Sequence, residues 1–221
     1  MLINGINILN TYGAILTDGY KYTPPEVSIS HFKGRRTSFY QLLESEAEMG
    51  KLHIPIVFKG NGIRSVTERK SSFDALIYPK VEIQLEDGFM YTSILSNIGD
   101  AQYIGRNAIK STYEFRTLRH KPMVETKGNE LFCDFTYPYV ACDIEVTVSA
   151  DATNYVVGTV NFPSVTAGQT LEIDGINGRI LVNGAPGAQF AEWIEFPTLV
   201  PGENKIECAD TVTVRYYPTF M

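Results

Sequence analysis

The sequence predicts a mainly β protein whose first half contains one helix and whose second half consists of strands and turns. Composition is the first observation: 12% of the 221 residues are aromatic and 18 are glycine, which favours sheets and tight turns. The second is an alternation of apolar and polar residues, clearest at residues 171–173 and 212–216. This period places successive side chains on opposite faces of a strand, so that one face can be buried.

Turn residues connect these C-terminal strands. Asp174-Gly175 and Asn177-Gly178 tolerate positive φ and suit tight hairpins, which predicts a returning strand at residues 179–182. Further on, Pro201 provides a φ of about −65° and Gly202 the permissive next position of a β-turn. That turn reverses the chain into another strand. The segment holds no group expected of an active site and is predicted to form a rigid sheet.

The first half shows the same alternation, interrupted by turns. Residues 1–9 fit a short strand or a tight hairpin about Asn4-Gly5, and residues 12–22 fit loop and turn. Further strands are predicted at residues 27–32, 52–58, 81–85, 89–91, 94–98, 103–109 and 111–118. The third and fourth of these flank Asp87-Gly88, which predicts a hairpin.

One helix is predicted in this half, over residues 65–78. Ser65 and Glu68 have the spacing of a capping box at its start. Apolar residues three and four positions apart share one face of it: Phe73, Leu76 and Ile77. Pro79 ends it, because proline cannot continue a helix without losing a hydrogen bond.

The acidic run at residues 44–48 is open to two structural interpretations. It fits one helical turn closed by Gly50 or a solvated loop. Glu44, Glu46 and Glu48 also offer the paired carboxylates that a glycosidase needs. A polar, exposed run does not raise the pKa of a general acid, so catalysis is not expected there.

A domain boundary is predicted between residues 122 and 138. Lys121-Pro122 ends a block of strands, and the polar residues 127–130 follow it. The expected domains are residues 1–130, β-rich with one helix, and residues 131–221, a β-sandwich.

Charge and the terminal sequence exclude several classes of protein. A net charge of −6 argues against broad binding to nucleic acid, which requires clustered cations. The local basic run at residues 33–36 is interpreted as a solvated loop or edge strand. Residues 1–5 do not resemble a signal peptide, and no apolar run is long enough to span a bilayer. We therefore expect a soluble protein made in a reducing cytoplasm.

Side chains suited to catalysis or metal binding do not form a known pattern. The three histidines are His31, His53 and His120, and the three cysteines are Cys133, Cys142 and Cys208. Their spacings match no zinc site, redox pair or disulfide framework, and no nucleotide-binding or hydrolase motif occurs. The prediction is no enzyme, no catalytic residue, no metal and no cofactor, with the cysteines as small buried hydrophobes.

Trp193 is the only tryptophan, and it has two interpretations. On a β-sandwich, an exposed tryptophan is able to stack on a sugar face. Alternatively, it is a half-buried packing anchor beside Phe190 and Phe196.

The C-terminal motifs resemble, in their order, the distal tail proteins (the Dit family) of long-tailed phages with non-contractile tails. The resemblance rests on residues 171–173, 179–184, 196–206 and 212–220, and on an opening strand at residues 3–8. Within the third of these segments, the residues of the family-like structural motif are Phe196, Pro197, Leu199, Pro201, Gly202 and Asn204.

The resemblance implies a fold and a role. The fold is a barrel-like, β-rich N-terminal domain that closes into a homo-hexameric ring, with a peripheral galectin-like C-terminal sandwich. The role is a hub at the distal end of the virion tail, assembled in the host cytoplasm. Implied partners are the tail tube protein and tail-tip proteins, including a tail-associated lysin or a receptor-binding protein.

The implied ring has a central channel through which DNA passes without specific binding, and no membrane is involved. An acidic balance suits such a conduit, because phosphates are not held by a wall with few cations. The alternative function is a carbohydrate-binding module of a host-adsorption apparatus, with Trp193 as its platform.

Overall fold

The structure is a computed structural model that describes residues 1–17, 19–33 and 40–221. It divides into two compact units, residues 1–120 with Met221, and residues 121–220. Each unit has its own hydrophobic core. The strand β12 (Val124–Lys127) pairs with β23 (Thr213–Tyr216) of the second unit, so the second unit begins before residue 131. The expected mainly β fold class is confirmed.

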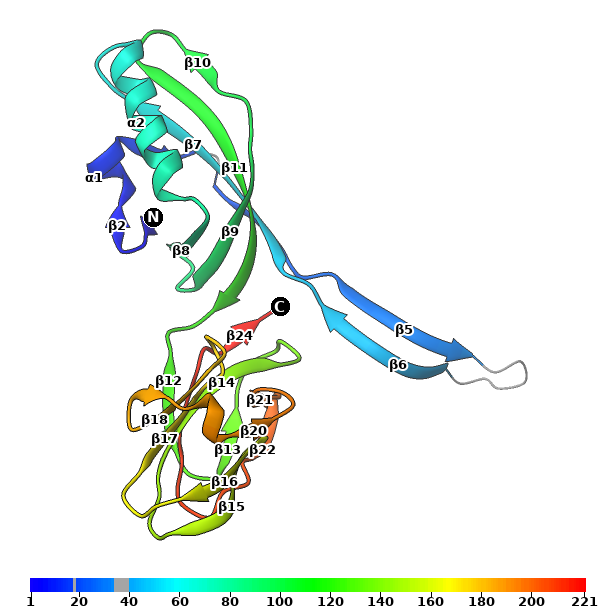
Figure 1. Ribbon diagram of the computed structural model, residues 1–221. Coiled ribbons are helices and arrows are strands. Elements are labelled where there is room, and N and C mark those ends of the chain that lie inside the picture. Colours follow the sequence, from blue (N-terminus) through cyan, green and yellow to red (C-terminus); the bar gives the residue numbers. More distant parts are fainter. Residues whose placement is uncertain (18, 34–39) are drawn as a thin grey trace. The chain divides into compact units, whose positions relative to one another are not determined.

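The first unit is built on one antiparallel sheet whose main path runs β2-β1-β8-β9-β11-β7-β3. Its strands are β1 (Leu2–Ile3), β2 (Ile6–Asn7), β3 (Ala14–Leu16), β4 (Lys21–Thr23), β7 (Gly50–Lys59), β8 (Lys80–Gln84), β9 (Met90–Ile98), β10 (Gln102–Ile104) and β11 (Ala108–His120). Figure 1 shows the long strands bending so that the sheet curls into a half-barrel, with the helix α2 (Ile63–Leu76) on one face.

Packing beneath α2 explains why this helix forms. The helix buries Val66 and Phe73, and the Phe73 ring meets those of Phe58 and Tyr113 edge-on, each with centroids 5.2 Å apart. Alternate residues of β7, among them Leu52 and Ile54, are buried in the same core. A helix with a weak intrinsic pattern is thus stabilised by one aromatic cluster.

Local structure differs from the sequence-based expectation at both helices. The α2 helix begins at Ile63 after Gly62, with no side-chain cap, so the proposed capping box at Ser65 and Glu68 is wrong. A short helix that was not predicted, α1 (Ile8–Tyr12), lies where a strand or loop was expected. The Asn7 side chain caps its first turn by accepting from two backbone N–H groups, a contact favoured by asparagine at this position.

The acidic run is part of a strand rather than a helical turn or loop. β6 (Tyr40–Ala47) pairs with β5 (Val27–Lys33), with a bulge between Ser30 and His31. Throughout the described part of the chain, these two strands pair only with each other. They form the two-stranded ribbon in blue at the right of Figure 1. The predicted basic turn falls mainly on residues 34–36, which lie outside the described residues.

The second unit contains several short antiparallel sheets around one core. Its strands are β12, β13 (Glu130–Cys133), β14 (Val140–Thr147), β15 (Ala152–Val157), β16 (Val160–Val165), β17 (Thr170–Asp174), β18 (Arg179–Val182), β19 (Ala185–Pro186), β20 (Glu192–Trp193), β21 (Thr198–Leu199), β22 (Gly202–Lys205), β23 and β24 (Thr219–Phe220). The largest sheet runs β12-β23-β14-β17-β18-β19, and smaller ones are β13-β22 and β15-β16-β20. Strand alternation supplies the core, as in β14, where Cys142, Ile144 and Val146 are buried.

No helix within the described ranges is long and apolar enough to cross a membrane.

Candidate interaction surfaces

The family-like motif forms a chain reversal rather than a chemical site. Asn204 donates its Nδ2 to the carbonyl oxygens of Val200 (2.8 Å) and Gly202 (3.0 Å), and its Oδ1 accepts from the Val200 N–H (2.9 Å). Gly202 has φ 93°, a conformation that side chains rarely allow. Three hydrogen bonds from one amide thereby fix the turn into β22.

The other motif residues lie before and within this turn. Pro197 and Leu199 are buried, Phe196 is half-buried and Pro201 is exposed. Leu199 pairs with Val140 of β14, which attaches the segment to the core. The structure therefore gives the motif a packing and turn-forming position, and its functional meaning stays a prediction.

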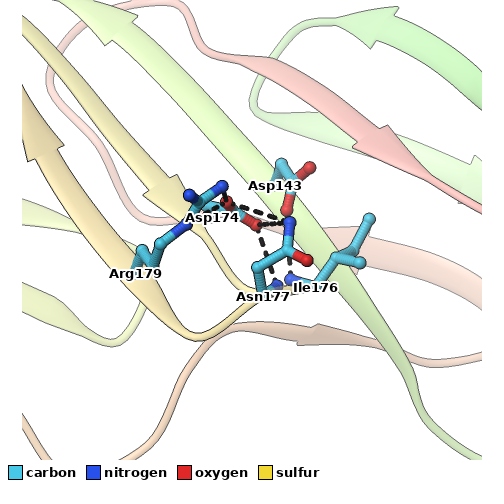
Figure 2. Close-up of polar contacts among 5 residues, drawn as sticks. All are labelled: Asp143, Asp174, Ile176, Asn177 and Arg179. Carbon is cyan, nitrogen blue, oxygen red and sulfur yellow. Dashed lines mark hydrogen bonds and ion pairs between the residues drawn. The ribbon is translucent and has the colours of Figure 1, made fainter. Parts of the chain in front are cut away.

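A second ordered turn is centred on Asp174, whose side chain is only 4% exposed. Figure 2 shows Arg179 and Asn177 converging on its carboxylate. Arg179 donates from Nε (3.0 Å), and Asn177 donates from its backbone N–H (2.9 Å) and Nδ2. Burial alone raises the pKa of Asp174, but these hydrogen bonds outweigh it and hold the pKa below its ordinary value.

Asp143 lies directly opposite Asp174 in the β14–β17 ladder. One of its oxygens accepts from the Ile176 N–H at 3.1 Å, as Figure 2 shows. Burial first, and then the charges of Asp174 and Glu172, raise the pKa of Asp143. The pKa of Asp143 is thus raised and that of Asp174 lowered, so Asp174 stays ionised to lower pH than Asp143 does.

Replacing Asp143 with asparagine is expected to stabilise the second unit by about 0.5 kcal/mol at pH 7, because like charges directly opposite in a sheet are destabilising. The amide still accepts from Ile176. A raised pKa means that wild-type stability is lost as pH rises through that pKa. The gain should therefore vanish in acid, where Asp143 is protonated in both the folded and unfolded states. Urea unfolding at several pH values measures it.

Glu145→Gln is the matched control on the same strand. Glu145 also faces a carboxylate, Glu172, across the ladder, but it accepts from Arg215 Nη2 at 2.7 Å. In Glu145→Gln, loss of the ion pair with Arg215 should cancel the stabilisation gained by removing the repulsion from Glu172. Equal stabilisation by Asp143→Asn and Glu145→Gln would show that charge reduction alone, rather than the Asp143–Asp174 pair, is responsible.

In the first unit, one sheet edge is apolar on both faces. The last residue of β9 that pairs with β8 is Ile94. After it, β9 pairs only with β11, and β10 also pairs only with β11 among the described strands. The other side of both segments is therefore an open strand edge. Ile98 and Tyr103 lie opposite the buried Tyr113 and Ile109, hence on the core side, and Ile104 lies on the other face. These side chains are 38%, 57% and 54% exposed, respectively. We call this edge, residues 94–104, the β9–β10 edge.

Among the residues whose side chains the structure describes, histidines and cysteines do not converge on a chemical site. His53 faces Glu114 at 3.5 Å, His120 is buried against Thr92 at 2.9 Å, and no metal-binding cluster occurs in the described ranges. Cys133 and Cys142 are buried and Cys208 is half-buried. Burial raises the pKa of the Cys142 thiol to about 12, which keeps it protonated and unreactive at neutral pH.

Trp193 lies at the edge of the β15-β16-β20 sheet. It pairs with the buried Val160, so its ring belongs to the core-facing side, and it lies 6.2 Å from Phe196. Its exposed fraction is 39%. The nearby hydrogen bond from Asn161 to Glu192 belongs to the opposite face, because those two residues also pair with each other. The glycan platform stays a prediction, and this neighbouring polar pair does not contribute to it.

These features define a class of fold: a curled β unit with an open apolar edge, followed in sequence by a unit of antiparallel sheets with ordered turns. No family model matches the chain, and no curated protein matches it. Among solved structures, it is similar to the Dit (gp 19.1) protein of phage SPP1, described as a paradigm of the hub adsorption apparatus in phages that infect Gram-positive bacteria.

That likeness has a TM-score of 0.67 at 12% identity and covers 100% of this chain and 98% of the SPP1 protein. The resemblance to distal tail proteins is thus confirmed as a likeness of fold. Two structures of the phage P2 baseplate in its activated conformation, with Ca and with Sr, match at TM-scores of 0.48 and 0.49 and 7% identity, covering 91% of both chains.

Proposed function

We propose that this chain is a structural component of a phage tail, which forms a homo-hexameric hub between the tail tube and the tail tip or baseplate. The observation that carries the proposal is the fold likeness to the SPP1 hub protein over 100% of this chain. Because fold alone does not determine function, the surfaces of the first unit supply the second argument.

The β9–β10 edge supports self-association. Soluble proteins protect open strand edges with lysine, proline or bulges. Residues 94–104 contain one bulge, opposite Glu114 and Phe115, but no lysine or proline and a single charged residue, Asp100. Large apolar side chains are exposed on both faces of this edge. An edge of this kind is suited to pairing with a strand of a second copy, which would cover both faces at once.

The ribbon of β5 and β6 supports the same proposal. A two-stranded hairpin is marginally stable by itself in water, and these strands pair with no third strand in the described part of the chain. Val27, within the ribbon, is 45% exposed. A neighbouring copy is the surface we expect this ribbon to pack against. Head-to-tail contacts of this kind close into a ring when the rotation permits.

The remaining parts of the proposal concern the channel and the partners. A net charge of −6 disfavours retention of DNA, so a lumen formed by such copies would let DNA pass. We propose the tail tube protein and tail-tip proteins as neighbours, the distal virion tail as the location and the host cytoplasm as the place of assembly. No catalytic step is part of the role.

Replacing Ile104 with lysine is expected to weaken self-association by about tenfold or more, or about 1.4 kcal/mol. A lysine at this edge opposes strand pairing and would have to be desolvated at the contact. Light scattering over a concentration series measures the shift toward monomer.

Ile194→Lys is the matched control, because Ile194 is 101% exposed in the second unit. This variant should associate as the wild type does. Unchanged association of Ile104→Lys, or an equal loss in both variants, would contradict the role given to the β9–β10 edge.

A further inference from the structure

The outer face of the β13–β22 pair carries an exposed aromatic side chain that the fold does not use. Leu131 and Cys133 of β13 point into the core and are 8% and 2% exposed, whereas Phe132 between them is 73% exposed. Strand alternation sets this direction. A single exposed ring is common on protein surfaces, so the charges and the strand edge around Phe132 decide whether it marks a contact surface.

Carboxylates surround this ring. Glu203 lies opposite Phe132 in the ladder, and Glu130 and Asp134 lie two positions before and after Phe132, on the outward-facing positions of the alternation. A shallow depression of ≈ 580 Å³ runs over β13 and β22. We call this surface the Phe132 patch: Phe132, Glu130, Asp134 and Glu203.

Charge determines what kind of partner the Phe132 patch fits. Glu130, Asp134 and Glu203 are exposed carboxylates, and the neighbouring cation Lys205 lies 3.9 Å from Glu130. An aromatic face bordered by carboxylates attracts lysine or arginine through the ring and the charges together. Phosphates would be repelled.

The backbone determines the shape of that partner. β13 and β22 pair only with each other in the described residues, so their outer edges remain available for hydrogen bonds to an added strand. An extended segment that alternates cationic and apolar residues would pair with the strand edge, the carboxylates and the exposed Phe132 ring at once.

We propose that the Phe132 patch is a docking site for an extended, lysine- or arginine-bearing segment of another protein. The site belongs to the second unit and does not depend on ring formation by the first. A full-length chain that fails to form rings can still bind such a segment, so the two proposals fail separately.

The test is an amide NMR titration of the full chain with a short acetylated peptide of alternating lysine and valine. We expect saturable shifts centred on Phe132 and Glu203, and none with the corresponding glutamate–valine peptide. Glu203→Lys should weaken binding about tenfold by replacing attraction with repulsion. Phe132→Ser should weaken it several-fold, by roughly the value of an exposed cation–π contact.

Two control variants distinguish a loss of binding at the Phe132 patch from a general effect of net charge or of exposed aromatic area. Glu192→Lys makes the same change in net charge outside the patch, and Phe190→Ser removes another exposed ring, 57% exposed; both should bind as the wild type does. Equal losses in control and patch variants would overturn the proposal. So would the absence of saturable binding, or shifts at these residues caused by a neutral cell-wall oligosaccharide in place of the lysine peptide, which would make the surface a glycan site.

Discussion

Replacing Asp174 with alanine is expected to lower the free energy of unfolding of the second unit by about 2 kcal/mol, typical of hydrogen bonds lost at a charged acceptor. The carboxylate is 4% exposed and accepts from Arg179 and from both the backbone and side chain of Asn177. Alanine leaves these donors without their common acceptor and frees the turn between β17 and β18. Because Asn177 and Arg179 are exposed, their freed donors regain water, and the cost is that of the lost hydrogen bonds to a charged acceptor.

Fluorescence of Trp193, the only tryptophan, follows urea unfolding of this unit selectively. Asp174→Asn is the matched variant, because its amide oxygen still accepts from the Asn177 N–H while the charge that pairs with Arg179 is lost. The free energy of unfolding of Asp174→Asn should lie between those of the wild type and Asp174→Ala. A cost below about 0.5 kcal/mol for Asp174→Ala, typical of a surface substitution, would show that the carboxylate does not hold the turn.

Phe73→Ala is expected to destabilise the first unit by about 4 kcal/mol, the usual cost of removing a fully buried phenylalanine. The ring is 0% exposed and meets Tyr12, Phe58 and Tyr113 edge-on. The Phe73 ring lies between α2 and the sheet residues Phe58 and Tyr113, so its loss leaves a cavity between the two.

Far-ultraviolet circular dichroism follows this loss, while Trp193 fluorescence should keep its midpoint because it reports the other core. Ile63→Ala is the control on the same helix, since Ile63 is 51% exposed, and it should cost less than about 1 kcal/mol. A shift of both signals by Phe73→Ala would contradict the separation of the two cores.

Strands with strong alternation were predictable from the sequence. The hairpin about Asp87-Gly88 appears as β8 and β9, and the strand predicted at residues 111–118 lies within β11. Both follow from a two-residue period bounded by turn residues, which is a local signal.

Elements that depend on distant contacts were not predictable in the same way. The acidic run joined β6 because strand pairing with β5 satisfies its backbone, although its polar sequence suggests a loop. The α2 helix begins before the Ser65 capping pattern because Phe73 and Val66 anchor it to the sheet. Tertiary packing overrides such weak local preferences.

The candidate surfaces were the least visible in the sequence. Exposure of Phe132 depends on which face of β13 meets the core, and the openness of the β9–β10 edge depends on where β8 ends. Both are properties of register and strand order, which one residue's identity does not reveal. The signal that was available is an aromatic residue between two inward-facing apolar ones, as in Leu131-Phe132-Cys133.

Negative-stain electron microscopy of the purified 221-residue chain shows directly whether it assembles into a hub. We expect rings of six copies around a central hole for the wild type and for Ile194→Lys, and far fewer rings for Ile104→Lys at the same concentration. Single particles without a hole at high protein concentration, with the second unit still folded by Trp193 fluorescence, would contradict this expectation.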